Sequence, residues 1–439
     1  MFQTLLPFFV AGLGQICTGL FFERAQHWWF FVSVPESFVL IPALLGLKGN
    51  LEVTYASRFC TMSNAGRTHN AEEIFTVARF NLSLVEFQAC VLSFLAAVLS
   101  TAISLISCDF NSSHFLVVFA SGIYAAALSS LVVGTMMVVL VVITRRYDID
   151  PDNIAAPITA TFSDFITLLA LIGCGMLFLY LCIHQACLFS VLLVLFLLCA
   201  TPCMAWYAFK NPHTRDILKH GWPALVAATI AEWQQIDFQK IFFSFSGLLL
   251  QSSISVFPGI AALHPLITGL GGNRVSVQSS RLCTALHLSP YPLGTLPDGT
   301  TVRTYFNPFR LLCLQHIDSK VAFLLLLTAI PYNFLFVIIV IFAAKNVDFS
   351  WILVSAYVVA AFVQGLVLFY LCQVTVYTLW WLRMDPDNSS FPILTSVGDV
   401  LGIGMLYAVF LILSLCAPKT VRYQHYQTMN STRHCGVLF

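Results

Sequence analysis

The chain has 439 residues, of which 59% are hydrophobic and only 9% are charged. Soluble domains carry about 25% charged residues, so this chain cannot cover a water-facing surface and a lipid bilayer must be its solvent. The net charge of +1 excludes a nucleic-acid-binding protein, which needs a concentrated basic face. The composition therefore predicts an all-α polytopic membrane protein.

Eleven segments are candidate membrane spans, because a helix needs about 20 mostly apolar residues to cross the hydrocarbon. Seven are strongly apolar: 82–107, 114–144, 158–183, 186–209, 321–344, 350–382 and 391–416. Four weaker ones contain Gly, Pro or polar residues, as broken helices do: 4–22, 34–47, 222–242 and 247–270. No basic region precedes the first of these, so it is predicted to be a span and not a cleaved signal peptide.

The basic residues predict the orientation of the chain, because Lys and Arg concentrate in cytoplasmic loops. With a cytoplasmic N-terminus, 15 of the 21 Lys and Arg residues fall inside and 6 fall outside. This orientation places the C-terminus on the extracellular side, together with the Asn-x-Ser/Thr sequons at Asn111 and Asn430. We expect a multi-pass protein of the plasma membrane. The 14 cysteines lie mostly in apolar runs and do not indicate a compartment.

Two motifs occur twice, in the same order. The first is Pro42…Asn50…Arg58, which recurs as Pro265…Asn273…Arg281 with both spacings of eight preserved. The second is Asp150-Pro-Asp-Asn153…Pro157…Asp164, which recurs as Asp385-Pro-Asp-Asn388…Pro392…Asp399 with both spacings preserved. The offsets are 223 and 235 residues. Two motifs in one order at similar offsets indicate an internal duplication.

The number of spans predicts how the two copies are related. Each copy has five spans, an odd number, so a direct fusion would invert the second copy. The extra span at 186–209 restores the orientation and makes the repeats parallel, with a pseudo-two-fold axis along the membrane normal. We therefore expect a monomeric pseudo-dimer. Its parts are a first repeat at 1–185, a linker helix at 186–212, a second repeat at 213–417 and a short tail at 418–439.

The Asp-Pro-Asp-Asn motif predicts a helix start at the cytoplasmic mouth. Asp or Asn caps free backbone N–H groups, and Pro157 and Pro392 are expected in the first turn of the following helices. The trailing Asp164 and Asp399 lie seven residues further on, or roughly 10 Å at 1.5 Å per residue. Both carboxylates are therefore expected well inside the membrane, on equivalent helices.

A carboxylate inside a span costs about 2.5–3.5 kcal/mol on insertion scales, so two of them require a compensating cation. The sequence offers no paired Lys or Arg at that depth, which favours a hard divalent ion such as magnesium, held by oxygen ligands. In the alternative, Asp164 and Asp399 are structural polar groups bonded to neighbouring helices. The four mouth carboxylates either cap helices or attract cations: Asp150, Asp152, Asp385 and Asp387.

Further candidates for the cation path are polar residues in or near the weaker spans. Asn50 and Asn273 follow glycines where the second span of each copy is predicted to end. The backbone there is expected either to unwind, with carbonyls facing a cavity, or to form a tight turn. Three acids are also candidates: Glu36, Glu86 and Glu232. The two copies differ within this segment: Lys48 corresponds to Gly271, and Glu52 corresponds to Val275.

The segments around Asn50 and Asn273 and both Asp-Pro-Asp-Asn motifs resemble solute carrier family 41, the eukaryotic relatives of bacterial MgtE magnesium transporters. The resemblance covers nearly the whole chain. It implies a fused version of a homodimer of five-helix domains with a magnesium path at the dimer axis, in which Asp164 and Asp399 correspond to the pore ligand. Bacterial relatives add magnesium-sensing domains. This chain begins almost directly in its first span, so regulation by such a sensor is not expected.

The leading hypothesis is transport of magnesium or other divalent cations, with the metal ion and the lipid bilayer as the partners. Sodium/magnesium exchange, with sodium as coupling ion, and channel-like conduction both remain open. An intramembrane magnesium-dependent enzyme is the alternative of another class. It would need clustered acids with basic residues to hold a diphosphate, and Arg145-Arg146 is the only nearby candidate. A membrane scaffold without transport activity is a third alternative, but it would not explain why Asp164 and Asp399 are kept in the membrane at an energetic cost.

Overall fold

The computed structural model describes residues 2–25, 28–34, 37–65, 71–106, 112–147, 149–184, 187–220, 257, 260–296, 305–308, 317–343 and 349–416. Within these ranges every regular element is helical. The helices are α1 (Phe2–Ala25), α2 (Trp29–Ser33), α3 (Ser37–Asn64), α4 (Ala71–Ile106), α5 (Ser112–Arg146), the 3-10 turn η1 (Pro151–Asn153), α6 (Ala155–Ile183), α7 (Cys187–Phe209), α8 (Pro212–His220), α11 (Ile260–Leu288), α14 (Ile317–Ala343), α15 (Trp351–Trp381) and α16 (Pro386–Cys416).

Seven of the described helices are long and apolar enough to cross a membrane: Glu72–Val98, His114–Arg146, Ala155–Ile183, Cys187–Phe209, Ser319–Ala343, Trp351–Trp381 and Pro386–Cys416. Each overlaps one of the seven strongly apolar segments of the sequence, so the existence of these seven spans is confirmed, although the first begins ten residues earlier than predicted. The first weak span corresponds to α1, whose apolar part is Leu6–Phe22. The span predicted at 222–242 and half of the one predicted at 247–270 lie outside the described residues, so the count of eleven stays a prediction.

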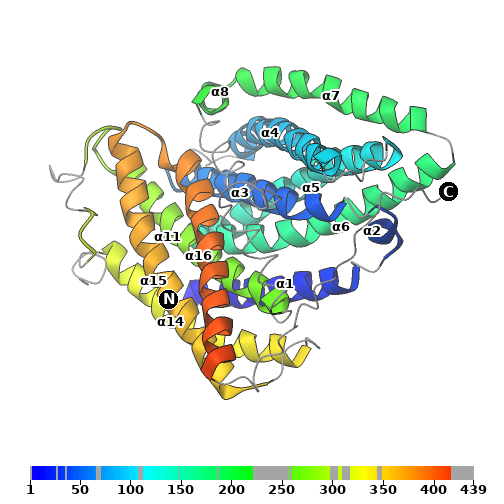
Figure 1. The fold of residues 1–439 in the computed structure, drawn as a ribbon. Coiled ribbons are helices and arrows are strands. Elements are labelled where there is room, and N and C mark those ends of the chain that lie inside the picture. The colour runs from blue at the N-terminus through cyan, green and yellow to red at the C-terminus, as the bar shows by residue number, and fades with distance from the viewer. Residues whose placement is uncertain are drawn as a thin grey trace.

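The helices form two groups that cross each other (Figure 1). Helices α3 to α7 make up the first group, and α11, α14, α15 and α16 make up the second. The groups meet where α3 packs on α16 and α6 packs on α11. Helix α1 joins them, since it contacts α6 of the first group and α11 and α14 of the second. The region where α1, α3, α6, α11 and α16 converge is therefore built from both groups.

Helices α3 and α11 correct the prediction for the two Gly-Asn segments. Each helix runs without interruption through its segment, and α3 ends only at Asn64. The backbone at Asn50 and Asn273 is neither unwound nor turned, so both readings of these segments were wrong. A span without water around it must satisfy its backbone hydrogen bonds internally, which favours a continuous helix even across glycine. The side chains, and not the carbonyls, are thus the groups that these segments present.

Pro157 and Pro392, at equivalent positions of the two motifs, occupy different places in their helices. Pro157 lies in the first turn of α6, as predicted, because η1 precedes that helix. Helix α16 instead begins directly at Pro386, so Pro392 lies inside it, and the prediction for Pro392 was wrong. Proline has no N–H to donate to the preceding turn. The start of α16 therefore carries one backbone hydrogen bond fewer than an uninterrupted helix.

Three basic residues that were counted as cytoplasmic loop charges are buried inside helices. Lys48 and Arg58 lie on α3 with exposed fractions of 3% and 5%, and Arg274 lies on α11 with 4%. Buried residues on a helix say nothing about the sidedness of loops. The orientation stays a prediction that rests on the other basic residues.

Candidate cation site

A cavity of about 440 Å³ lies where the two groups of helices converge. Asp164 of α6 and Asp399 of α16 line it, together with Asn50 of α3 and Asn273 of α11. The structure therefore brings together four residues that the two repeated motifs singled out. The cavity is also lined by the polar residues Gln15, Thr18, His264, Thr268, Ser276 and Thr395.

On the first-repeat side, α1 supplies a partner for Asp164. The Gln15 side-chain NH2 donates to Asp164 Oδ2 at 3.0 Å, and Gln15 is itself buried. The opposite amide orientation would bring two acceptor oxygens together, so the NH2 assignment follows from the contact. Gly269 of α11 makes room for this side chain, since a Cβ there would lie 2.8 Å from Gln15 Cδ.

A buried ion pair lies behind this side of the cavity. The Lys48 ammonium pairs with the Glu52 carboxylate one turn further along α3, and both charges act on Asp164. The sequence offers no Lys or Arg that occurs in both copies at the depth of the aspartates, and Lys48 is a single cation whose equivalent in the second copy is Gly271. The pair is internally compensated, however, so it adds no net cation to balance Asp164.

The second-repeat side has fewer internal contacts. Asp399 accepts no hydrogen bond from any described residue, and Asp164 is the charged group that acts on it. Asn273 is buried and its Nδ2 has no partner among the described residues. Asn50, its equivalent in the first repeat, accepts a hydrogen bond from the Thr395 hydroxyl of α16. The two sides of the cavity are thus chemically unequal.

A second polar cluster lies at the Asp-Pro-Asp-Asn end of the helices. Asp150 caps η1 by accepting from the backbone N–H of Asp152 at 3.1 Å, and Asp385 accepts from that of Asp387 at 3.0 Å. The predicted helix starts are confirmed. The second Asp of each motif accepts instead from a serine of the other repeat. Asp387 accepts from Ser57 and Asp152 accepts from Ser280, at 2.6 Å in both cases.

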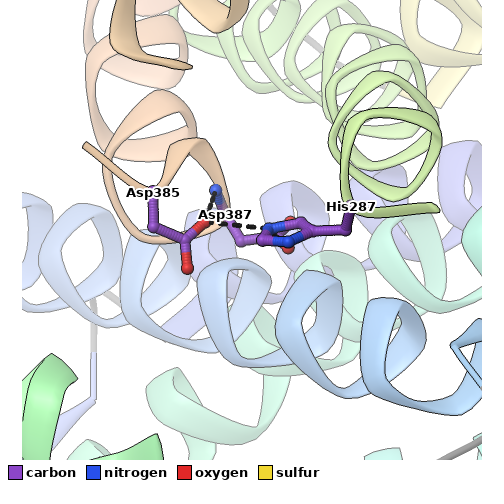
Figure 2. Close-up of side chains that lie close together, drawn as sticks. All are labelled: His287, Asp385 and Asp387. Atoms are coloured by element: carbon purple, nitrogen blue, oxygen red, sulfur yellow. Dashed lines mark hydrogen bonds and ion pairs between the residues drawn. The ribbon is translucent and has the colours of Figure 1, made fainter. Parts of the chain in front are cut away.

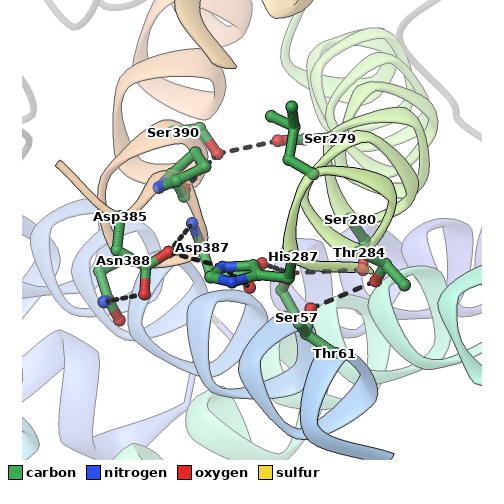
Figure 3. Close-up of polar contacts among 12 residues, drawn as sticks. Ser57, Thr61, Ser279, Ser280, Thr284, His287, Asp385, Asp387, Asn388 and Ser390 are labelled. Carbon is green, nitrogen blue, oxygen red and sulfur yellow. Dashed lines mark hydrogen bonds and ion pairs between the residues drawn. The ribbon is translucent and has the colours of Figure 1, made fainter. Parts of the chain in front are cut away.

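Equivalent residues of the two repeats meet at this cluster, which we term the crossed latch: Ser57, Ser280, Thr61, Thr284, Asp152 and Asp387. Figure 3 labels all of them except Asp152. The Thr61 and Thr284 hydroxyls are 3.2 Å apart, and the Ser57 and Ser280 hydroxyls are 3.3 Å apart. Each serine has one proton, which its short contact to a carboxylate already uses. The two serines therefore touch without sharing a hydrogen bond, and carboxylates of opposite repeats hold them.

Around the crossed latch the two halves again differ. His287 Nε2 lies 3.2 Å from Asp385 Oδ1 and 3.4 Å from Asp387 Oδ2 (Figure 2). Asn64, 223 residues earlier, occupies the equivalent place and donates to Asp152 Oδ2 at 2.8 Å. His287 and the two aspartates are close enough to hold a metal ion. Their contacts to each other and to Ser57 also account for their arrangement without one.

Arginines extend the latch in the same crossed pattern. Arg281 of α11 donates to Asp150 Oδ2 at 3.2 Å and to Asn153 Oδ1 at 2.8 Å, both in the first repeat. Arg58 of α3 faces the charges of Asp385 and Asp387, although its guanidinium nitrogens have no hydrogen bond among the described residues. All four mouth carboxylates are thus occupied by capping or by contacts between the repeats.

Asp152 belongs to the crossed latch and lies in η1, before the membrane span formed by α6. Burial raises the pKa of the Asp152 carboxyl to about 7, and the neighbouring Asp150 charge acts in the same direction, while the Ser280 hydrogen bond opposes both. Its protonation state therefore changes close to neutral pH.

The remaining predicted acids are Glu36, Glu86 and Glu232. Glu86 of α4 is buried near Lys48 and Glu52 but does not line the cavity wall. Glu36 and Glu232 lie outside the described residues. Sequence reasoning missed Gln15, Thr395 and the two serines. The serines could have been found, because they precede the repeated arginines at the same offset of 223, whereas nothing in the sequence pairs Gln15 with Asp164.

The described residues thus define a helical membrane protein with carboxylates and amides gathered in one internal cavity. Comparison with known proteins agrees with this class. A sequence profile described as MgtE, divalent cation transporter, matches residues 41–174 and 264–409, and the two matched segments contain both copies of the motifs. The chain belongs to the MgtE family of divalent cation transporters.

Within that family its relatives are members of solute carrier family 41. The chain is 36% identical over 416 residues to solute carrier family 41 member 3 of Mus musculus, covering 94% of this chain and 82% of that one. It is 36% identical over 417 residues to member 2 of Xenopus laevis, covering 94% and 71%, and 36% identical over 423 residues to member 2 of Homo sapiens, covering 95% and 71%. No solved structure matches the chain.

Proposed function

We propose that this chain transports magnesium through the central cavity, along a pseudo-two-fold axis between two parallel repeats. The observation that carries the proposal is that Asp164 and Asp399 line one cavity together with Asn50 and Asn273. Each pair comes from equivalent positions of the repeated motifs. Carboxylate and amide oxygens around one cavity are the kind of ligand set that a hard divalent cation takes.

The size of the cavity supports a hydrated ion. Magnesium gives up its waters reluctantly and is usually held by one or two carboxylates. Six waters occupy about 180 Å³ at roughly 30 Å³ each, which is less than the 440 Å³ of the cavity. A hexahydrated ion therefore fits, and the aspartates can bind it through its waters or displace one of them.

The crossed latch supports a transport cycle with a closed step. None of its residues lines the cavity, and Val53 and Ser276, on the cavity wall, are one turn away from Ser57 and Ser280. The latch therefore lies at the predicted cytoplasmic mouth, one helical turn beyond the cavity wall. An ion can leave toward the mouth only when the serine–aspartate contacts between the repeats separate.

The test is magnesium uptake into liposomes that contain the purified full chain, followed with an enclosed magnesium dye. Uptake is expected to fall strongly in Asp164→Asn with Asp399→Asn, since the neutral amides remove both charges without changing side-chain size. Undiminished uptake in this double variant would contradict the proposal. An imposed sodium gradient separates the two transport modes: uptake that depends on it indicates exchange, and uptake indifferent to it indicates channel-like conduction.

A further inference from the structure

The two sides of the cavity differ in how many of their ligand groups are already engaged. On the first-repeat side, Asp164 accepts from Gln15 at 3.0 Å and Asn50 accepts from Thr395. On the second-repeat side, Asp399 and Asn273 have no side-chain hydrogen bond to a described residue. A symmetric site would treat the two sides alike.

The sequence explains this inequality at one position. Thr395 lies four residues before Asp399, and the equivalent position four residues before Asp164 is Ala160. Both Thr395 and Ala160 line the cavity. Alanine has no hydroxyl, so the first repeat cannot provide for Asn273 what Thr395 provides for Asn50. Among the described residues, no hydroxyl therefore donates to Asn273 Oδ1, the amide atom that can bind a cation, and the buried Nδ2 of the same amide has no acceptor.

We propose that the cavity binds its divalent cation unequally, with Asp399 and Asn273 as the principal ligands and Asp164 and Asn50 as the secondary ones. The inference rests on the proposed function and specifies which repeat carries the ion. An ion that approaches Asp399 displaces only water. An ion that approaches Asp164 competes with the Gln15 NH2 group, which lines the same cavity and cannot itself bind a cation.

Magnesium favours such an arrangement, because it needs near-ideal octahedral geometry and commonly takes a single carboxylate while keeping most of its waters. Two carboxylates would have to be equally placed around the ion to share it. One free carboxylate with the oxygen of a free amide beside the cavity satisfies the ion with less rearrangement. Asp164 then acts as the second contact on the path, at which the ion is held more weakly.

The experiment compares Asp164→Asn with Asp399→Asn in the full chain, by the magnesium concentration for half-maximal uptake in liposomes and by magnesium titration of the purified protein. Asp399→Asn is expected to weaken binding by at least about ten-fold more than Asp164→Asn, which corresponds to about 1.4 kcal/mol. Asn273→Ala and Asn50→Ala repeat the comparison with the amides, and the same order is expected.

Gln15→Met supplies a readout that a purely structural role would not change. It removes the donor to Asp164 at similar side-chain volume, so the difference between Asp164→Asn and Asp399→Asn is expected to narrow in this background. Ala160→Thr is expected to donate a hydrogen bond to Asn273 and to weaken magnesium binding. Thr395→Ala is expected to leave magnesium binding unweakened. Elution as a monodisperse peak in detergent controls for folding.

The outcomes distinguish this inference from the proposed function. If neither aspartate variant changes uptake, the proposed function fails. If both lose the same affinity, or if Asp164→Asn loses more, magnesium still uses the cavity but the unequal site is wrong. An unchanged difference in the Gln15→Met background would refute the role assigned to Gln15.

Discussion

Ser57 and Ser280 lie 223 residues apart in the sequence, and their hydroxyl oxygens lie 3.3 Å apart in the structure. Each donates to an aspartate of the other repeat, at 2.6 Å in both cases. Hydrogen bonds to an ionised carboxylate are about twice as strong as those between neutral groups. The contact therefore holds the two repeats together at one end of the cavity.

A disulfide tests whether this contact must open. Ser57→Cys with Ser280→Cys is expected to cross-link under a mild oxidant, because the two Oγ atoms are nearly in contact. Magnesium uptake is then expected to stop and to return after reduction. Each single variant, oxidised in parallel, controls for the native cysteines. Full uptake by a cross-linked double variant would show that the latch stays closed during transport.

The pH dependence of stability tests the environment of Asp152. The pKa of its carboxyl is raised to about 7 from an ordinary value near 4. Between these values the folded protein keeps a proton that the unfolded chain has lost, so stability falls as pH rises through this window. Thermal unfolding in detergent at pH 5 to 8 measures this fall.

Asp152→Asn cannot lose a proton, so it should show a smaller decrease than the parent chain. The difference should be on the order of a few kcal/mol at pH 8, given ~1.4 kcal/mol per pKa unit. Glu72→Gln, at an exposed acid on α4, is the matched control and should change nothing. A constant gap between Asp152→Asn and the parent chain across this range would mean that Asp152 is ionised throughout.

The buried pair of Lys48 and Glu52 predicts strong coupling between two substitutions. Lys48→Met or Glu52→Val alone should cost about 3–5 kcal/mol, because each leaves an uncompensated buried charge. The double variant should lose far less, since well-packed apolar residues often replace such pairs at little cost. Unfolding free energies of the four proteins form a double-mutant cycle. Additive losses would mean that the two side chains do not form a pair.

Gly269 predicts a steric effect on the cavity. Gly269→Ala would place its Cβ 2.8 Å from Gln15 Cδ, so Gln15 must move, and overpacking of this kind costs about 1–3 kcal/mol. The Gln15 contact to Asp164 should weaken, which a shift in the midpoint of magnesium titration would report. Gly272→Ala is the control, since nothing lies within 4 Å of its Cβ position. Equal behaviour of the two variants would argue against close packing of Gln15 on α11.

The sequence was enough to predict three features: the seven strongly apolar helices, the capped helix starts at Asp150 and Asp385, and the pairing of equivalent positions. These features follow from local rules: apolar length sets a span, and a side-chain oxygen two residues before a free N–H sets a cap. The continuous helices at Asn50 and Asn273 were not predictable in this way. Glycine weakens a helix locally, and only the surroundings decide whether the backbone hydrogen bonds can be satisfied otherwise.

The sequence by itself thus determined the class of protein, and it predicted the duplication and the two carboxylates that line the cavity, because each follows from composition or spacing. The tertiary structure decided that Gln15 engages Asp164, that Thr395 engages Asn50, and that the serines cross to aspartates of the other repeat. These contacts join residues at least 128 positions apart, and nothing in their spacing predicts which helices converge. The inequality between the two sides of the cavity is a product of that packing, since the repeated motifs alone would make the sides alike.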